Sequence, residues 1–158
     1  MLKEYKSKRN FKKTSEPKNS KSDLKNIFVI QRHDARNLHY DFRIQIGKSL
    51  KSWAIPKGIS RKTGEKKLAV ETENHPLDYV NFEGIIPEGN YGAGTVKIFD
   101  KGIFENLRTI NIKKSYEEGK IEILLKGKKL KEKFALIRLK PNIRYPSENN
   151  WLIMRMKS

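Results

Sequence analysis

The sequence predicts a mainly β protein, built as one antiparallel barrel or sandwich domain. Short apolar or alternating runs recur along most of the chain. Turn signals containing Gly and Pro separate these runs, at residues 56–58, 87–89 and 92–94. No amphipathic helix of ordinary length is evident, and the best short candidate lies at residues 111–118. The length of 158 residues suits a single domain with a substantial core.

Each predicted strand follows from its own pattern. Residues 27–30 are an apolar run between polar residues, and residues 38–46 alternate between apolar and polar side chains. Further strands are predicted at residues 50–55, 68–73, 95–99, 102–105, 120–125, 134–139 and 151–156. Residues 1–22 have almost no aliphatic side chains, so we expect a partly flexible N-terminal arm that cannot form a core of its own.

The charge favours a polyanionic partner. The formal net charge is +17, from 35 basic and 18 acidic residues. The arm contributes +6 of this, from eight basic minus two acidic residues. Because bound Lys and Arg release counterions from phosphates, nucleic acid is favoured over an anionic membrane surface. The arm itself is read equally well as a solubilising tail or as a nucleic-acid contact.

The composition also excludes several classes of site. The chain has no cysteine, which rules out disulfides, thiolate catalysis and cysteine-ligated metal centres. No apolar run approaches the roughly 18–20 residues that cross a bilayer, and the lysine-rich N-terminus lacks a signal-peptide core. We therefore expect a soluble cytoplasmic protein without a membrane partner, associated with the nucleoid if its partner is DNA.

The run at residues 38–46 predicts a strand with one apolar and one polar face. The apolar parity comprises Tyr40, Phe42, Ile44 and Ile46, and the polar parity comprises His39, Asp41, Arg43 and Gln45. A short turn at residues 35–37 brings His33 back beside the polar face. His33, His39 and Asp41 are the ligand types of a two-histidine, one-carboxylate metal site, and they suit Mn²⁺ or Zn²⁺ better than Ca²⁺. The alternative interpretation of the same spacing is a solvated polar face.

Two further patterns surround this face. Arg43 extends it, and a guanidinium beside a cation suits a phosphate. The third histidine, His75, shares a parity with Glu71 and Glu73. One interpretation makes His75 a general acid or a phosphate ligand. The other makes it a strand-end histidine before Pro76, and the local pattern alone favours this one. Lys67 is either a solvated lysine or a phosphate contact.

The ordered motifs resemble the 3′-phosphoesterase module of bacterial and archaeal DNA ligase D. They lie at residues 31–43 (QRHDARNLHYDFR), 50–58, 75–79 (HPLDY), 82–96, 134–138 and 150–153. The resemblance spans about residues 9–156, and no ligase or polymerase region is present, so the chain resembles a free-standing form. It implies a compact β-barrel domain over residues 23–158 behind the arm at residues 1–22.

The resemblance also implies a Mn²⁺-dependent enzyme that heals the 3′ ends of DNA primers. Members remove a 3′-terminal ribonucleoside and then hydrolyse the remaining 3′-phosphate, serving a ligase and a polymerase that here would act in trans. His33, His39 and Asp41 match the metal ligands. Catalytic positions are matched by His75, Arg43 and Tyr79, phosphate-binding positions by Arg9, Arg43, Lys67 and His75, and supporting positions by Glu16 and Glu73.

The chain departs from the family pattern at two positions, and two other functions remain open. Asn10 stands where an Asp is frequent, and Lys67 stands where many members have an Arg, which removes a bidentate fork. These departures leave the balance of the diester and monoester steps undecided. The alternatives are a catalytically weak DNA-end-binding module that recruits a ligase or polymerase, and a two-histidine-carboxylate oxygenase, which the basicity argues against.

Overall fold

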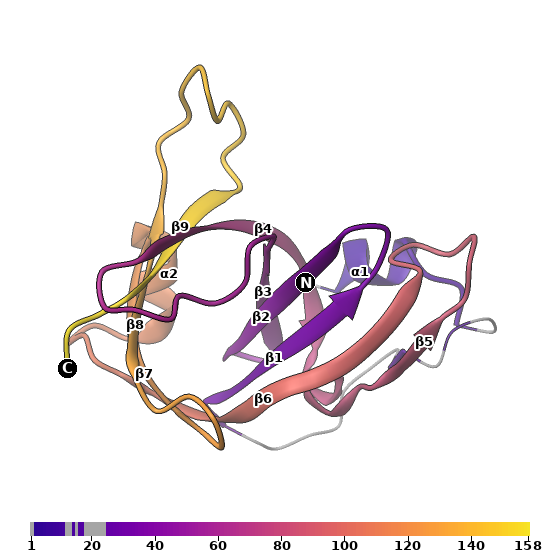
Figure 1. The fold of residues 1–158 in the computed structure, drawn as a ribbon, viewed down its shortest axis with the longest axis horizontal. Coiled ribbons are helices and arrows are strands. Elements are labelled where there is room, and N and C mark those ends of the chain that lie inside the picture. Colours follow the sequence, from indigo (N-terminus) through magenta and orange to yellow (C-terminus); the bar gives the residue numbers. More distant parts are fainter. Residues whose placement is uncertain (1, 12–13, 15, 18–24) are drawn as a thin grey trace.

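A closed antiparallel barrel forms the body of the protein (Figure 1). The computed structural model describes residues 2–11, 14, 16–17 and 25–158. In these residues the sheet runs in the order β1-β2-β3-β4-β9-β8-β7-β6, and pairing of β6 with β1 closes it. A short strand, β5, adds to one end of β6. The closed barrel confirms the predicted fold class.

Most elements follow one another with short connections, and longer loops join β3 to β4 and β8 to β9. The strands are β1 (Ile27–Asp34), β2 (Leu38–Ile46), β3 (Ser49–Ile55), β4 (Lys66–Pro76), β5 (Gly84–Ile86), β6 (Gly94–Asn106), β7 (Lys120–Gly127), β8 (Lys133–Arg138) and β9 (Asn150–Arg155). The helices are α1 (Lys3–Ser7), the 3-10 helix η1 (Leu77–Asn81) and α2 (Ile112–Glu118). No helix among the described residues is long and apolar enough to span a membrane.

The barrel wall has an apolar inner face and a site-bearing outer face. Phe28, Ile30, Phe42 and Ile44 are fully buried and pack inside with the two tryptophans of β3 and β9. The alternate residues of β1 and β2 therefore point outward. This arrangement confirms the apolar and polar parities predicted for residues 38–46.

A second apolar cluster covers part of the outer face. It comprises Tyr5, Ile27, Val29, Leu50, Leu77, Tyr79, Val80, Phe82, Ile86 and Val96, contributed by α1, β1, β3, η1, β5 and β6. The outward polar residues of β1 and β2 thus lie between two apolar clusters, one inside the barrel and one outside it. Polar groups in such a position are shielded from water and must find partners in the protein.

Four elements differ from the sequence prediction, namely β6, β5, η1 and α1. β6 is one continuous strand where two strands, 95–99 and 102–105, were predicted. Gly102, the first residue of the second predicted strand, lies inside β6, where only glycine fits because a Cβ would be 2.2 Å from the Lys126 carbonyl oxygen of neighbouring β7. β5 and η1 were not predicted. α2 matches the candidate helix at residues 111–118, with Asn111 accepting a capping hydrogen bond from the Lys114 amide.

The described part of the N-terminal arm packs on the barrel. α1 was not predicted, yet it contacts β4, and its Tyr5 is completely buried in the outer cluster. The remaining arm residues, 1, 12–13, 15 and 18–22, lie outside the described residues, so flexibility there is still only expected. The division into an arm (1–22) and a domain (23–158) stays a prediction.

Candidate active site and metal centre

Three side chains from the β1–β2 hairpin converge on one point. The register pairs His33 directly with His39, and Asp41 lies two residues further along the same face. His33 Nδ1 is 3.4 Å from one Asp41 carboxylate oxygen, and His39 Nε2 is 3.2 Å from the other. One potential ligand atom from each residue lies within 4.8 Å of the others. This group can bind a metal ion, as the sequence predicted.

The outer nitrogen of each histidine is held by the backbone. His33 Nε2 donates to the Gly92 carbonyl at 2.7 Å, and His39 Nδ1 donates to the Asn37 carbonyl at 3.0 Å. Because a carbonyl only accepts, these two ring nitrogens carry protons. His33 Nδ1 and His39 Nε2 face Asp41, where each donates to the carboxylate as an N–H or, without that proton, offers its lone pair to a metal ion. Metal-ligating histidines characteristically have this second-nitrogen contact. The donor set of two imidazole nitrogens and one carboxylate therefore fits a divalent transition metal.

The electrostatics of the centre also favour a cation. Burial opposes ionisation of Asp41, but the charge of Arg43 and hydrogen bonds from His33 and His39 outweigh it and hold the pKa of Asp41 well below its usual range. The hydrogen bond to Asp41 raises the pKa of His39, partly offset by burial. Asp41 is therefore an anion at neutral pH, and a proton on His39 competes with a metal ion for the same lone pair.

Arg43 lies next to this centre and is fixed by a buried amide. Gln31 accepts a hydrogen bond from Arg43 Nε at 2.7 Å and donates to the carbonyls of Tyr79 and Phe82 at 2.9 and 3.1 Å. The Arg43 guanidinium lies 4.7 Å from the centre of the Tyr79 ring, and its NH2 is 3.4 Å from Asp41. Gln31 was not singled out from the sequence, although it shares the parity of His33 on β1.

His75 lies between two guanidinium groups. Its Nε2 is 3.2 Å from Arg9 NH2, and its Nδ1 is 2.9 Å from the Glu73 carbonyl and 3.2 Å from Arg43 NH1. Since Arg9 can only donate and the carbonyl can only accept, the proton lies on Nδ1. Burial, aided by the charges of Arg43 and Arg9, lowers the pKa of His75 well below its usual value. His75 is therefore neutral at pH 7.

The arm contributes a buried ion-pair network. Arg9 Nε donates to Glu16 at 2.8 Å, and Arg9 NH1 donates to Glu73 at 3.1 Å. Tyr79 donates its hydroxyl to Glu16 at 2.7 Å, and Thr14 also donates to Glu16. The Glu16 and Glu73 side chains are only 1% and 3% exposed. The arm residues that the resemblance matched thus reach the other predicted site residues.

These groups line one cavity of about 270 Å³. Its lining comprises Arg9, Glu16, His33, Ala35, His39, Asp41, Arg43, Ala54, Thr72, Glu73, His75, Tyr79, Ile86, Tyr91 and Gly92. The lining residues that were not predicted are Ala35, Ala54, Thr72, Ile86, Tyr91 and Gly92. Tyr91 and Gly92 lie in the loop between β5 and β6, which has no periodic signal, and Thr72 lies on β4 in the parity opposite to that of Glu73 and His75. Every predicted site residue except Lys67 lies here.

Lys67 is placed elsewhere. Lys67 pairs with Ile153 of β9, whose side chain points into the barrel. His75 pairs with Leu50 of β3, which belongs to the outer cluster. Because paired residues share a face of the sheet, Lys67 and His75 lie on opposite faces of β4. Lys67 Nζ lies 3.7 Å from Glu65 instead. The expected phosphate contact therefore has no geometric support. Asn10, the other departure from the family pattern, is exposed and does not line the cavity.

The family model and the related proteins that match this chain all belong to DNA ligase D. Residues 31–138 match the DNA Ligase D 3'-phosphoesterase domain family. The Multifunctional non-homologous end joining protein LigD of Pseudomonas aeruginosa is 41% identical over 160 residues, covering 99% of this chain and 18% of the relative. The protein of the same name from Mycolicibacterium smegmatis is 39% identical, covering 97% and 20%. The Multifunctional non-homologous end joining DNA repair protein LigD of Mycobacterium tuberculosis is 38% identical, covering 99% and 20%. The chain thus spans about a fifth of these relatives.

Proposed function

This chain belongs to the DNA ligase D 3′-phosphoesterase family, and on that premise we propose that it heals DNA 3′ ends in a metal-dependent manner. The substrates are primer ends that carry a 3′-terminal ribonucleotide or a 3′-phosphate. The observation that carries the proposal is the convergence of the His33, His39 and Asp41 ligand set with Arg43 and His75 on one cavity. We assign Mn²⁺ as the ion, with Zn²⁺ as the nearest alternative for this donor set.

The two steps are hydrolyses at the same phosphorus. In the diester step, water adds to phosphorus and the bond to the 5′ oxygen of the terminal ribonucleoside breaks, so that oxygen leaves with a proton. The primer then carries a 3′-phosphate. In the monoester step, water adds again and the bond to the primer 3′ oxygen breaks, which releases inorganic phosphate and leaves a 3′-hydroxyl.

The chain's own residues position the phosphate. Arg43, held by Gln31, offers its guanidinium to non-bridging oxygens where charge grows in the transition state. Arg9 supplies a second buried guanidinium, which His75 orients through Nε2. Because His75 is neutral, it acts through this contact rather than as a proton donor to the leaving oxygen. A divalent ion held by His33, His39 and Asp41 would supply Lewis acidity toward a phosphate oxygen.

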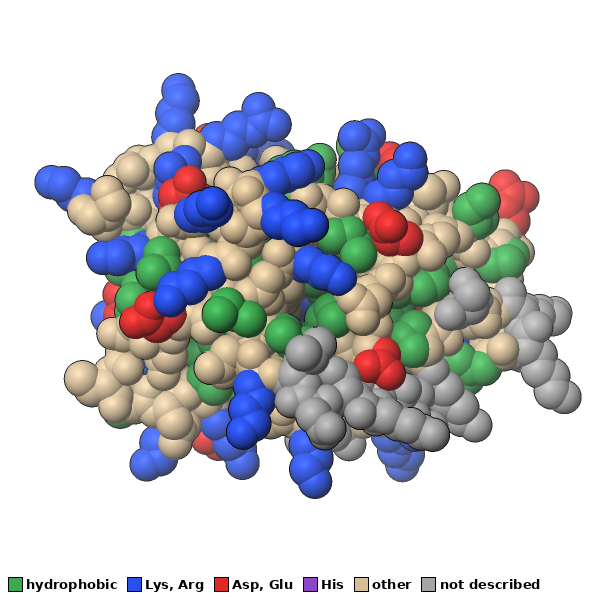
Figure 2. All heavy atoms as spheres, turned by 90° about the horizontal axis from the view of Figure 1, so that it is seen from below, with side chains coloured by type: hydrophobic (Ala, Val, Ile, Leu, Met, Phe, Trp, Pro, Cys, Tyr) green, Lys and Arg blue, Asp and Glu red, His purple; other side chains and the backbone are tan. Residues whose placement is uncertain are grey.

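The charge of the chain supports DNA as the partner. Figure 2 shows lysine and arginine side chains spread over the face it presents, with fewer acidic ones. A net charge of +17 favours binding along a phosphate backbone. The names of the relatives place them in non-homologous end joining, so we propose that this chain prepares ends for a ligase and a polymerase and works at the nucleoid.

The test uses a 5′-labelled primer–template that ends in one ribonucleotide. With Mn²⁺ the primer should shorten to a 3′-phosphate and then to a 3′-hydroxyl end, and EDTA should stop both steps. His39→Ala should abolish both steps, while Lys67→Ala, outside the cavity, should retain them. Full activity of His39→Ala with added Mn²⁺ would refute the proposal, and tight binding without turnover would favour the end-binding alternative.

A further inference from the structure

A second cavity adjoins the candidate active site. It measures about 480 Å³, within the range of roughly 300–1,000 Å³ that is typical of small-molecule sites. It shares Thr72, Glu73 and Tyr91 with the site cavity, so the two cavities lie side by side. It opens beside β4 because β9 pairs with β4 only from Lys66 to Val70. We call this cavity the lateral pocket.

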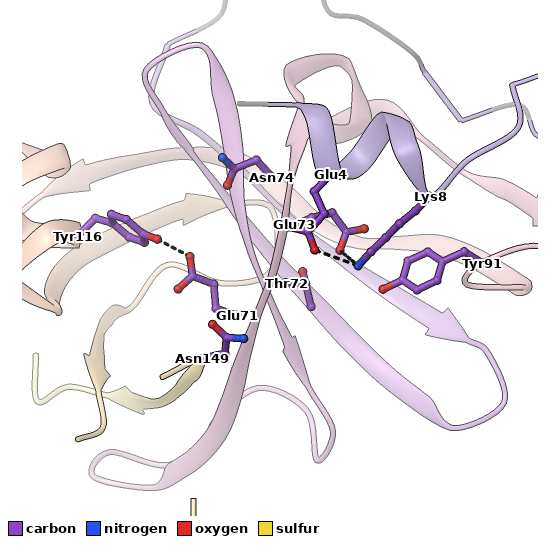
Figure 3. A pocket seen from close by; sticks show the side chains of 9 residues that line it. All are labelled: Glu4, Lys8, Glu71, Thr72, Glu73, Asn74, Tyr91, Tyr116 and Asn149. Carbon is purple, nitrogen blue, oxygen red and sulfur yellow. Dashed lines mark hydrogen bonds and ion pairs between the residues drawn. The ribbon is translucent and has the colours of Figure 1, made fainter. Parts of the chain in front are cut away.

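The lateral pocket is polar and its carboxylates outnumber its cations. Glu4, Glu71 and Glu73 line it together with Lys8, and Lys8 Nζ lies 3.1 Å from Glu4 and 3.4 Å from Glu73. Figure 3 shows Glu71, Thr72 and Glu73 following one another along β4, with Tyr116 on one side and Lys8 and Tyr91 on the other. A phosphodiester chain would be repelled from such walls, whereas an uncharged, hydroxyl-rich group would not.

We propose that the lateral pocket binds the 3′-terminal ribonucleoside that leaves in the diester step, with Glu71 accepting hydrogen bonds from its ribose hydroxyls. The inference rests on the proposed function. On one side of the scissile phosphate lies the primer, which carries a negative charge at every linkage. On the other side lies the terminal nucleoside, which is uncharged. The anionic primer then extends away from the lateral pocket, and the scissile phosphate lies beside Arg43 in the adjoining cavity.

Glu71 is preorganised to accept hydroxyl hydrogens. Tyr116 donates its hydroxyl to Glu71 Oε2, and Trp151 donates its indole N–H to Glu71 Oε1 at 3.1 Å. Trp151 is itself buried and stacked on Tyr116, so the carboxylate is held by rigid rings. Each carboxylate oxygen has a further lone pair to offer. A carboxylate that accepts from ribose hydroxyls is a recurrent means of reading ribose in nucleotide sites.

The pocket also offers groups for a base edge. The amide side chains of Asn74 and Asn149 line it. An amide presents both donors and acceptors, which suits the hydrogen-bonding edge of a base without imposing a charge. The pocket thus combines a carboxylate suited to ribose hydroxyls with neutral groups suited to a base, beside the cavity of the phosphate site.

The deciding experiment compares three 5′-labelled primers in Mn²⁺, ending in a ribonucleotide, a deoxyribonucleotide or a 3′-phosphate. The variant is Glu71→Gln, whose amide oxygen still accepts from Trp151 and whose amino group can donate to the Tyr116 hydroxyl. This variant keeps the ring contacts and removes the charge and one acceptor. We expect kcat/KM for the ribo-ended primer, relative to the 3′-phosphate primer, to fall about tenfold. The preference for the ribo-ended over the deoxy-ended primer should narrow.

Two further variants complete the design. Tyr116→Phe keeps the stacking on Trp151 but releases Glu71, so it should weaken the ribo preference in the same direction. Glu117→Gln, at an exposed position of α2 that lines neither cavity, should leave all three rates unchanged. Equal losses on the ribo-ended and 3′-phosphate primers, or no loss on either, would overturn the inference while the proposed function stands. An unaltered chain inactive on all three primers would overturn the proposed function and this inference with it.

Discussion

Replacing Gln31 by leucine tests whether the buried amide holds the active site together. Gln31 is fully buried, and its side chain makes three hydrogen bonds. The bond from Arg43 involves a charged group, worth about 1.5–3 kcal/mol, and the two bonds to carbonyls are worth about 1 kcal/mol each. Leucine fills a similar volume but satisfies none of the three partners. We therefore expect Gln31→Leu to lose about 3–5 kcal/mol of unfolding free energy.

Thermal and urea unfolding without metal measure this loss. For a chain of this length, about 3–5 kcal/mol corresponds to a drop in Tm of roughly 10 °C. The matched control is Gln45→Leu, because Gln45 lies on β2 and makes only longer bonds to backbone groups, at 3.2 and 3.4 Å. It should lose less than about 1 kcal/mol. The kcat/KM for a 3′-phosphate primer should also fall at least about tenfold in Gln31→Leu, since Arg43 loses its anchor. Equal stabilities of the two variants would refute the reasoning.

Two other predictions concern the backbone and pH. Gly92 has φ 75°, and its carbonyl accepts from His33 Nε2. The strain of Gly92→Ala should shift this carbonyl and weaken Mn²⁺ affinity about tenfold in a titration. Gly89→Ala, with φ 83° and nothing within 4 Å of its Cβ, should be as strained yet bind Mn²⁺ normally. Because the pKa of His75 is lowered in the folded protein, the unfolded chain takes up a proton first as the pH falls below about 6.5. The difference in metal-free unfolding free energy between the unaltered chain and His75→Gln, measured by urea unfolding, should therefore decrease from pH 7.5 to 5.5. A difference that stays constant or increases would contradict the assignment.

The hairpin of the site could be predicted from the sequence because its pattern is strictly local. Alternation with a period of two places His39, Asp41 and Arg43 on one face, whatever the rest of the fold does. The short turn after His33 then sets the register that pairs it with His39. The metal centre thus depends on contacts within some ten residues, which a single sequence can encode visibly.

The rest of the site depends on contacts between distant segments. Arg9 meets Glu73 across 64 positions, and the Gly92 carbonyl meets His33 across 59. The local sequence pattern around either residue of such a pair does not predict its contact with the other residue. Lys67 is the converse case, since the resemblance matched it to a phosphate-binding position and it lies on the same strand as His75, yet it does not line the cavity. A bulge in β4, opposite residues 50–52 of β3, reverses the side-chain alternation between Lys67 and His75, so the two side chains point to opposite faces.

The ligands of the metal centre alternate with residues of the barrel interior. Between His39, Asp41 and Arg43 stand Tyr40 and Phe42, and Phe42 is packed against Trp53 inside. A cavity or an overfilled gap beneath β2 would therefore tilt the strand and spread the ligand atoms apart. Along this strand, selection for catalysis and selection for packing act on one rigid ribbon, so adaptation to heat or cold has little freedom to alter either without the other.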